Sequence, residues 1–425
     1  MSTFLLVIIY LYYSISKNDK NFTSCKKTGH TIYSLGSSGA IIINCVPERS
    51  EESPHAIESC HADGVMKQSF NNIDYATLGY NILRGYPLAE GMDPGFTAPI
   101  FKADYSTLKV SADCRYSLPE GFHVYPQVAC DTSFSSEEIK SKKEFEDSVS
   151  GSVDAHGGGW GAKFSTHAGY AKASSKVQAG ESLLIHSQAD CRYYKSRLDL
   201  RSPPPLNEKF LNYVTELLLG ALSDEEGAVH NFFDTYGTHF VTELDFGARY
   251  TKQHEMTQSQ YDTASSSKFD VSVQASYSGL FSAGGGFSMD SEQRQAAMDF
   301  QKSVKTTTLT VGATPPASGD EMERASNVKL DPMPVGYRLQ SLEKLFTSQF
   351  MPGVVNYAAI NGIIEKHKET YCSKLSQRLG VEDTCRVSRS GLSSKFHKFI
   401  RCVAYLRCVA YQLFAMFNLP SACIC

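Results

Sequence analysis

Residues 268–283 alternate between apolar and polar side chains almost without interruption. A period of two places alternate residues on opposite faces of a β-strand. At about 3.3 Å per residue, this segment is long enough to cross a bilayer, for which about 9–11 residues of a tilted strand suffice. The pattern predicts either a barrel strand with one wet face or a half-buried strand of a soluble sheet. The apolar set is Phe269, Val271, Val273, Ala275, Tyr277, Gly279, Phe281 and Ala283.

A second segment, residues 149–170, is rich in Gly, Ala and Ser and also alternates. The three glycines at 157–159 interrupt it, and they predict a turn or bulge at which the register changes. The only tryptophan of the chain, Trp160, follows them directly. The apolar positions are Val149, Gly151, Val153 and Ala155 before the interruption, and Ala162, Phe164, Ala168 and Tyr170 after it.

The 425-residue chain can bury a substantial core. Its net charge of −4 argues against a nucleic-acid partner. Residues 1–16, apolar from 4 to 13, are similar to a secretory signal peptide and too short for a spanning helix. A buried N-terminal strand is the alternative. If the chain is secreted, as we expect, Asn21 lies in a usable glycosylation sequon, Asn-Phe-Thr.

The 12 cysteines fit an oxidising compartment, as secretion implies. No two of them form a C-x-x-C pair, which argues against zinc-ribbon and thioredoxin-type sites. The pairs Cys114–Cys130 and Cys372–Cys385 are candidate local disulfides, although spacing alone leaves the connectivity open.

Periodicity and capping residues predict a chain of mixed helices and strands. Residues 17–64 are polar and turn-rich, and the Cys-containing tail at 376–425 has a duplicated RCVAY. This tail is either an amphipathic membrane-surface helix or a stretch with no native role. Helices are expected over 135–149, 206–222, 223–236, 291–304, 339–350 and 354–371, and strands over 40–45, 238–250 and 306–311.

No motif of a known enzyme class is present. The chain has no G-x-S-x-G elbow, H-E-x-x-H helix or P-loop, and its glycine triplets lack dinucleotide-binding spacing. We therefore predict no catalytic residue, no metal site and no cofactor.

The segment Tyr236-Gly237-Thr238-His239-Phe240, followed six residues later by Gly247-Ala248, resembles the signature of the membrane attack complex/perforin (MACPF) family. The first five positions match. Ala248 departs from the pattern, because the family usually has a second glycine there. The run at 79–101 is also similar to the N-terminal part of this domain in perforin-like proteins. The resemblance extends over about residues 65–375.

This resemblance implies an α+β fold with a bent, twisted, four-stranded antiparallel sheet flanked by two helical clusters. In pore-forming members each cluster opens into a β-hairpin, and a ring of subunits joins its hairpins into one barrel. The clusters would fall at about 134–190 and 258–308, which contain the two alternating segments. Gly247 would lie where the central strand bends, and Ala248 would stiffen that bend. His239 is expected to be a packing residue, with an acid sensor as the alternative.

We therefore expect a secreted pore-forming protein whose partners are the bilayer of a target cell and further copies of the same chain. A non-lytic secreted member acting in adhesion or signalling is the alternative. Val271→Asp and Phe281→Asp are expected to leave folding intact and abolish lysis. The residues expected to face lipid are Val149, Val153, Phe164, Tyr170, Phe269, Val271, Val273, Tyr277 and Phe281.

Overall fold

The computed structural model describes residues 67–385, apart from 90–91, 132, 158–159, 219, 221–223, 315–326, 353–356 and 382–384, and two earlier strands. The expected signal peptide, Asn21 and the tail from residue 386 lie outside the described residues. The chain divides into two compact units, Met1–Lys67 and Gln68–Cys425. In the first unit, β1 (Gly29–Leu35) and β2 (Ile41–Pro47) form an antiparallel pair, which confirms the strand expected at 40–45.

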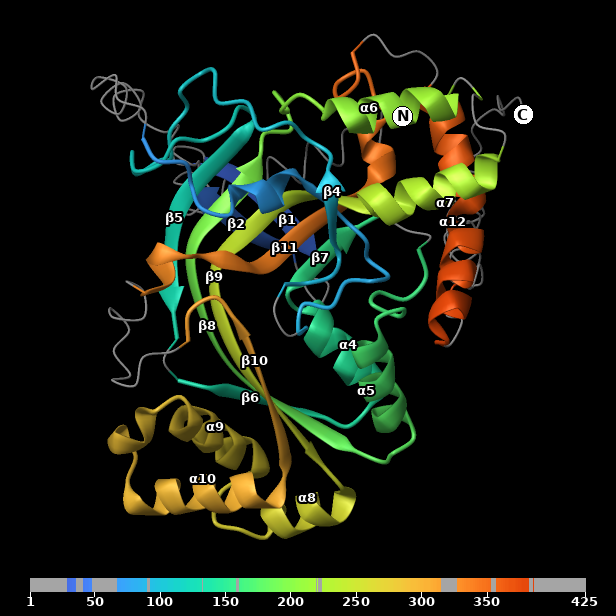
Figure 1. The fold of residues 1–425 in the computed structure, drawn as a ribbon. Helices are drawn as coiled ribbons and strands as arrows, with labels where there is room; N and C mark the ends of the chain where they lie inside the picture. Colours follow the sequence, from blue (N-terminus) through green and yellow to red (C-terminus); the bar gives the residue numbers. More distant parts are fainter. Residues whose placement is uncertain are drawn as a thin grey trace, which may run out of the picture. The chain divides into compact units, whose positions relative to one another are not determined.

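Two long antiparallel strands form the centre of the second unit (Figure 1). They are β8 (Leu183–Leu198) and β9 (His239–Met256), paired from Leu183 opposite Met256 to Arg197 opposite Glu243. Figure 1 shows both strands curving along their length. Most residues of β9 are buried. The strand expected at 238–250 is confirmed and continues to Met256.

Each long strand has two shorter strands in succession along its outer edge. β5 (Phe122–Cys130) and β6 (Ser135–Ile139) pair with β8, whereas β11 (Met333–Ser341) and β10 (Lys305–Val311) pair with β9. The order β5–β8–β9–β11 forms what we call the upper half of the sheet, and β6–β8–β9–β10 forms the lower half. The strand expected at 306–311 is therefore confirmed as β10.

The sheet has nine strands in total, so the expectation of four was wrong. The further strands are β3 (Leu78–Tyr80), β4 (Phe96–Pro99) and β7 (Val153–His156). β7 pairs with β11 in parallel, so the sheet is also not wholly antiparallel. The number rises because an unpaired strand edge offers hydrogen-bonding groups that short segments can satisfy. In each half of the sheet, four strands still lie side by side: the two long strands and one shorter strand at each outer edge.

Three helices pack around the upper half (Figure 1). They are α6 (Glu208–Leu218), α7 (Glu225–Tyr236) and α12 (Tyr357–Leu379), and they confirm the helices expected over 206–222, 223–236 and 354–371. α7 begins where Asp224 accepts a hydrogen bond from the Gly227 N–H, as an N-cap residue does. The short 3₁₀ helices η1 (Ile73–Thr77) and η3 (Leu342–Leu345) complete this region.

Two groups of helices lie at the lower half (Figure 1). The first cluster contains α4 (Lys142–Ser150), strand β7 and α5 (Ala168–Gln178). The second cluster contains α8 (Gln258–Ser265), α9 (Val271–Ser282), the turn η2 (Gly285–Ser288) and α10 (Ser291–Ser303). The helix expected over 291–304 is confirmed as α10.

Two helix predictions were wrong, the first of them only over residues 135–141. Residues 135–139 form strand β6, and the helix begins only at Lys142, where Ser141 and Glu144 form a capping box. The segment expected as a helix over 339–350 starts with the end of β11 and continues as η3. In both places the apolar residues also fit a strand, and pairing with a neighbouring long strand decided the outcome.

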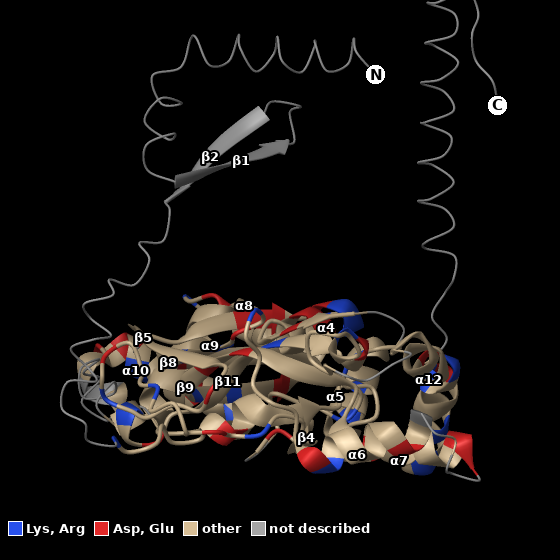
Figure 2. Cartoon of the chain, turned by 90° about the horizontal axis from the view of Figure 1, so that it is seen from above, with Lys and Arg blue, Asp and Glu red and all other residues tan. Residues whose placement is uncertain are grey.

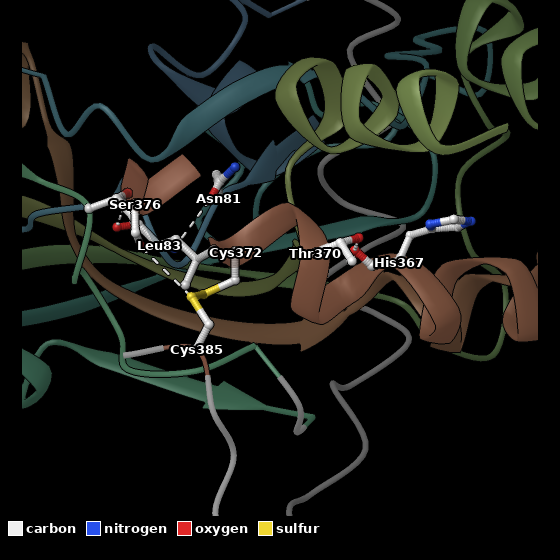
Figure 3. Close-up of a disulfide and its surroundings, with 8 residues drawn as sticks. Asn81, Leu83, His367, Thr370, Cys372, Ser376 and Cys385 are labelled. Atoms are coloured by element: carbon white, nitrogen blue, oxygen red, sulfur yellow. Dashed lines mark hydrogen bonds between the residues drawn. A yellow bond between two sulfur atoms is a disulfide. The ribbon is translucent and has the colours of Figure 1, made fainter. Parts of the chain in front are cut away.

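One predicted disulfide is confirmed and the other is wrong. Cys372 of α12 is bonded to Cys385, as Figure 3 shows, with the Ser376 hydroxyl 3.7 Å from the Cys385 Sγ. Cys130 is bonded to Cys191 and not to Cys114, which is in another disulfide. Cys130 and Cys191 lie directly opposite each other in the β5–β8 register, a pairing that short sequence spacing does not reveal.

Among the described residues, no helix is both long and apolar enough to cross a membrane. Figure 2 shows acidic and basic residues interspersed along the ribbon of the second unit.

Candidate functional site

The two clusters lie on opposite faces of the lower half of the sheet. Successive residues of a strand point to opposite faces, and β8 illustrates this at two neighbouring positions. Ile185 packs with Val271 of α9 and Phe300 of α10. The Nδ1 of His186, the next residue, lies 3.0 Å from the hydroxyl of Ser148 in α4. One sheet therefore carries both candidate insertion segments, one on each side.

In α9 the alternating sequence is coiled into a helix, so the strand expected at 268–283 is not present in this form of the protein. The helix divides the predicted lipid-facing residues into two groups. Its inner face is buried and contains Val271, Gln274, Ala275, Ser278 and Gly279. Its outer side is half-exposed and carries Val273, Tyr277 and Phe281, with Phe269 just before the helix and 5.3 Å from the Tyr277 ring.

The sequence of α9 satisfies two periods at once. Residues four apart share a face in a helix, and residues two or four apart share a face in a strand. Val273, Tyr277 and Phe281 therefore stay together in both conformations, whereas Val271 and Ala275 would join them only in a strand. The lumen-facing side of such a strand would carry the serines and the glutamine between them, together with Leu280.

The predicted lipid-facing residues of the first cluster are all buried in this structure. Val149 is 1% exposed, Val153 1%, Phe164 0% and Tyr170 4%. The Tyr170 ring stacks on Phe145 of α4 at 5.2 Å, and the Phe164 N–H donates a 2.7 Å hydrogen bond to the Ile82 carbonyl. All four belong to the main hydrophobic core that continues into the upper half.

The family signature joins α7 to β9 and holds the β3 segment against them. Gly237 has φ +80°, and a Cβ there would lie 2.6 Å from the Tyr80 carbonyl carbon, so only glycine fits. The Thr238 hydroxyl accepts a 3.0 Å hydrogen bond from the Ile82 N–H. The backbone N–H of Thr238 donates a hydrogen bond to the Tyr80 carbonyl. Tyr236 and Phe240 are buried in the main core. The motif therefore acts as a structural junction.

In the folded protein His239 does not titrate in the range that the acid-sensor alternative required. It is 1% exposed, and its Nδ1 lies 2.8 Å from the Thr238 hydroxyl. Burial, together with the positive charges of Lys368 and Lys163, lowers the pKa of His239 to about 3. The imidazole therefore stays neutral across the range near pH 6–7 in which a sensor was expected to act.

Gly247 lies at a close approach between β8 and β9. A Cβ at this position would be 1.9 Å from the Cys191 carbonyl oxygen, and the register shifts between Arg192 and Tyr194 directly opposite. Ala248 is fully buried beside Cys191. Its methyl group fits because Gly312 passes over it, at a point where a Cβ would be only 3.2 Å from that of Ala248. A glycine elsewhere thus makes room for the residue that departs from the family pattern.

Two buried histidines, one under each cluster, were not anticipated. His186 faces α4, and its Nε2 lies 3.1 Å from the Gln253 side-chain oxygen; burial lowers its pKa to about 4. His254 faces α10, with its ring 5.1 Å from Phe300 and its Nδ1 2.9 Å from the Thr306 hydroxyl. Burial and the nearby charge of Lys252 lower the pKa of His254 to about 3. Isolated histidines in strand-like sequence carry no signal that would have singled them out.

The described residues contain no cluster of three or more His, Cys, Asp or Glu side chains arranged to hold a metal ion. The charged side chains on the open face of the upper half pair with one another instead. Lys195 contacts Asp245 at 3.2 Å, and Arg338 contacts Glu243 at 3.1 Å. The described residues thus offer packed helices and paired charges, and the two clusters of the lower half are the candidate functional segments.

Comparison with known proteins places this arrangement in a family. The family model for the MAC/Perforin domain matches residues 58–387. Among solved structures, GNIP1Aa from Chromobacterium piscinae has a TM-score of 0.47 and 15% identity over 75% of this chain. Astrotactin-2, a vertebrate perforin-like membrane protein, has a TM-score of 0.39 and 14% identity over 73% of this chain. A protein with a MAC/Perforin domain from Bacteroides thetaiotaomicron has a TM-score of 0.41 and 9% identity over 73% of this chain.

This chain spans 58%, 47% and 62% of the lengths of those three structures, respectively. Proteins with this domain are pore-forming or perforin-like and are not enzymes; the family acts on membranes and oligomerises, and its members are typically secreted or membrane-associated. Because the family model covers most of the sequence, we conclude that this chain is a member of the MAC/Perforin family.

Proposed function

We propose that this protein is secreted and forms pores, assembling on a target membrane and inserting the first and second clusters as β-hairpins. The observation that carries this proposal is the double periodicity of α9. A soluble helix needs only an apolar stripe, so an alternation across residues 268–283 that only Leu280 interrupts is unexplained by the helix alone. It is explained if the same residues later form a strand with one face in lipid.

The refolding has a physical rationale. A hairpin in a bilayer must satisfy every backbone N–H and C=O, and a closed barrel assembled from many subunits does so. Each cluster continues directly from an end of a long central strand: α5 leads into β8, and α8 follows β9. The hairpins would therefore extend a sheet that already exists, with its register in place.

The cleanest test compares two neighbouring positions in the first turn of α9. Val273 and Ser272 are both half-exposed in the helix, and an acidic residue near a helix N-terminus is tolerated or stabilising. In a strand they lie on opposite faces. We expect Val273→Asp to abolish dye release from liposomes, because a charge on the lipid face of a barrel strand disfavours insertion in every subunit.

Ser272→Asp is the matched control and should retain dye release, since its side chain would face the aqueous lumen. Circular dichroism and thermal unfolding would establish that both variants fold. Equal activity of the two variants would contradict the proposed hairpin. Val271→Asp is not a suitable test, contrary to the sequence-based expectation, because Val271 is 2% exposed and a charge there would disrupt the soluble fold.

The non-lytic alternative keeps one observation in its favour. The four predicted lipid-facing residues of the first cluster are all part of the main core, which suits a cluster that never leaves the sheet. A secreted protein of this kind, acting in adhesion or signalling, would form no rings on liposomes and would release no dye from them. Electron microscopy of the protein on liposomes, alongside the dye assay, distinguishes the two functions.

A further inference from the structure

Trp160, in the middle of the first cluster, is anchored in the upper half of the sheet. It is 3% exposed. Its ring meets that of Phe233 edge-on at 4.7 Å, and its indole N–H donates a 3.3 Å hydrogen bond to the Ser341 hydroxyl. The Lys368 Nζ lies 5.1 Å from the ring centroid, within the range of a cation–π contact. The contacts come from α7, the end of β11 and α12.

The residues that receive Trp160 are held in place by polar contacts with the side chains around them. We call this group, Phe233, His239, Ser341, Lys368 and Tyr371, the Trp160 socket. The Tyr371 hydroxyl donates to the Asp234 carboxylate at 2.8 Å and accepts from the Asn81 amide at 2.7 Å. Lys368 is paired with Glu343 and, at 2.6 Å, with Glu365. The socket includes His239 of the family motif, so the motif and the first cluster meet here.

The backbone around Trp160 is shaped to reach this socket. Gly157 has φ +110°, and a Cβ there would lie 2.3 Å from the Cβ of Ser341, so the chain can pass only as glycine. Gly161 also has a positive φ, of +79°. This loop connects β7 to α5, and it would become the tip of the hairpin if the first cluster extended. The largest side chain near that tip is therefore held by parts of the molecule that do not insert.

We propose that Trp160 is a latch that keeps the first cluster closed in solution and must leave its socket before that cluster can extend; this inference rests on the proposed pore-forming function. In water, release exposes a large aromatic surface and breaks the bond to Ser341, so the closed form is favoured. A membrane surface reduces that penalty, because tryptophan is favoured at the boundary between lipid headgroups and hydrocarbon.

Hydrogen exchange in solution tests the latch without any membrane. In Trp160→Ala we expect the backbone amides of residues 142–178 to exchange at least about tenfold faster, because removing a buried Trp raises the population of the locally open form. Phe210→Ala is the matched control. Phe210 is a buried aromatic of α6 that contacts Phe232 and Tyr236 but is outside the socket.

Faster exchange in 142–178 that is absent from Phe210→Ala supports the latch, and the same exchange pattern in both variants overturns it. If Trp160→Ala does not fold, Trp160→Phe and Ser341→Ala decide the matter in the same way. Trp160→Phe keeps an aromatic ring without the N–H, and Ser341→Ala removes only the acceptor. Each should accelerate exchange in the same region by a smaller factor, and unchanged exchange in both overturns the latch.

Dye release separates this inference from the proposed function. Because Trp160 is the only tryptophan, its fluorescence reports release directly when the protein is mixed with liposomes. We expect the emission to change before dye escapes, and Trp160→Phe to shorten the lag. Dye release that precedes any change in emission overturns the latch. A wild-type protein that never releases dye refutes pore formation, whereas the exchange experiment still decides whether Trp160 holds the cluster closed.

Discussion

The first and second clusters face the same sheet but are held to it in different ways. Val149, Val153, Phe164 and Tyr170 of the first cluster belong to the main core that reaches the upper half. The second cluster has small cores of its own, one around Val271 and Phe300 and another around Phe134 and Tyr250. Much of the remaining α9 contact is polar, such as the 3.2 Å bond from the Ser187 hydroxyl to the Ala275 carbonyl.

This difference indicates an order of opening. Detaching the second cluster exposes few large apolar side chains, whereas detaching the first removes part of the main core and takes Trp160 from its socket. Segments with few buried apolar contacts open at lower free-energy cost. We therefore expect the second cluster to open first and the first cluster to control the final step.

The largest expected effect contrasts a core aromatic of the first cluster with a surface aromatic of the second. Phe164→Ala should lower the free energy of unfolding by about 3–5 kcal/mol, the usual cost of removing a fully buried Phe. Phe281→Ala, at a half-exposed position, should cost about 1 kcal/mol or less. Chemical denaturation measures both values. Similar losses would mean that the two clusters are equally integrated into the fold.

Acidification should loosen both clusters, because each covers a histidine with a lowered pKa. An unfolded histidine titrates near 6.5, whereas His186 and His254 titrate at about 4 and about 3 in the folded protein. The stability that each neutral histidine contributes to the folded protein is fully present above pH 6.5. It is lost as the pH falls from 6.5 toward the pKa of that histidine in the folded protein. At pH 5 each should cost about 2 kcal/mol of stability.

Substitution can assign this pH dependence to one cluster. His254→Asn keeps a polar group near Thr306 but does not titrate, so the decline in stability between pH 6.5 and pH 5 should become shallower. At pH 5, the backbone amides of α8–α10 should exchange more slowly in His254→Asn than in the wild-type protein. An unaltered slope would contradict the role assigned to burial.

The smallest effect concerns one ion pair in each cluster. Lys176 of α5 pairs with Glu255, and their side chains are 32% and 23% exposed; Lys268, just before α9, pairs with Glu292, and theirs are 69% and 63% exposed. Lys176→Ala should cost about 0.5–1 kcal/mol, because the pair is partly shielded from water. Lys268→Ala should cause no measurable change in the denaturation midpoint. The reverse ranking would reject the idea that the first cluster is held more firmly.

The elements that could be predicted were those with a strong local pattern. The helices α6, α7 and α10 have broad apolar stripes or clear capping residues. The helices expected at 135–149 and 339–350 were misplaced because their residues also fit a strand, and a free edge of β8 or β9 was available nearby. Neither Cys130–Cys191 nor the Trp160 socket could be foreseen, since both join residues that meet only across the folded sheet.

The sequence by itself determined that polar and apolar residues alternate along two segments, and that the signature from Tyr236 to Phe240 lies between those segments. Only the tertiary structure decided that α9 is a helix here, that the two clusters occupy opposite faces of one sheet, and that one is held by the main core. The reason is that periodicity specifies which side chains share a face in a given conformation. Which conformation forms depends on the surfaces available to bury that face.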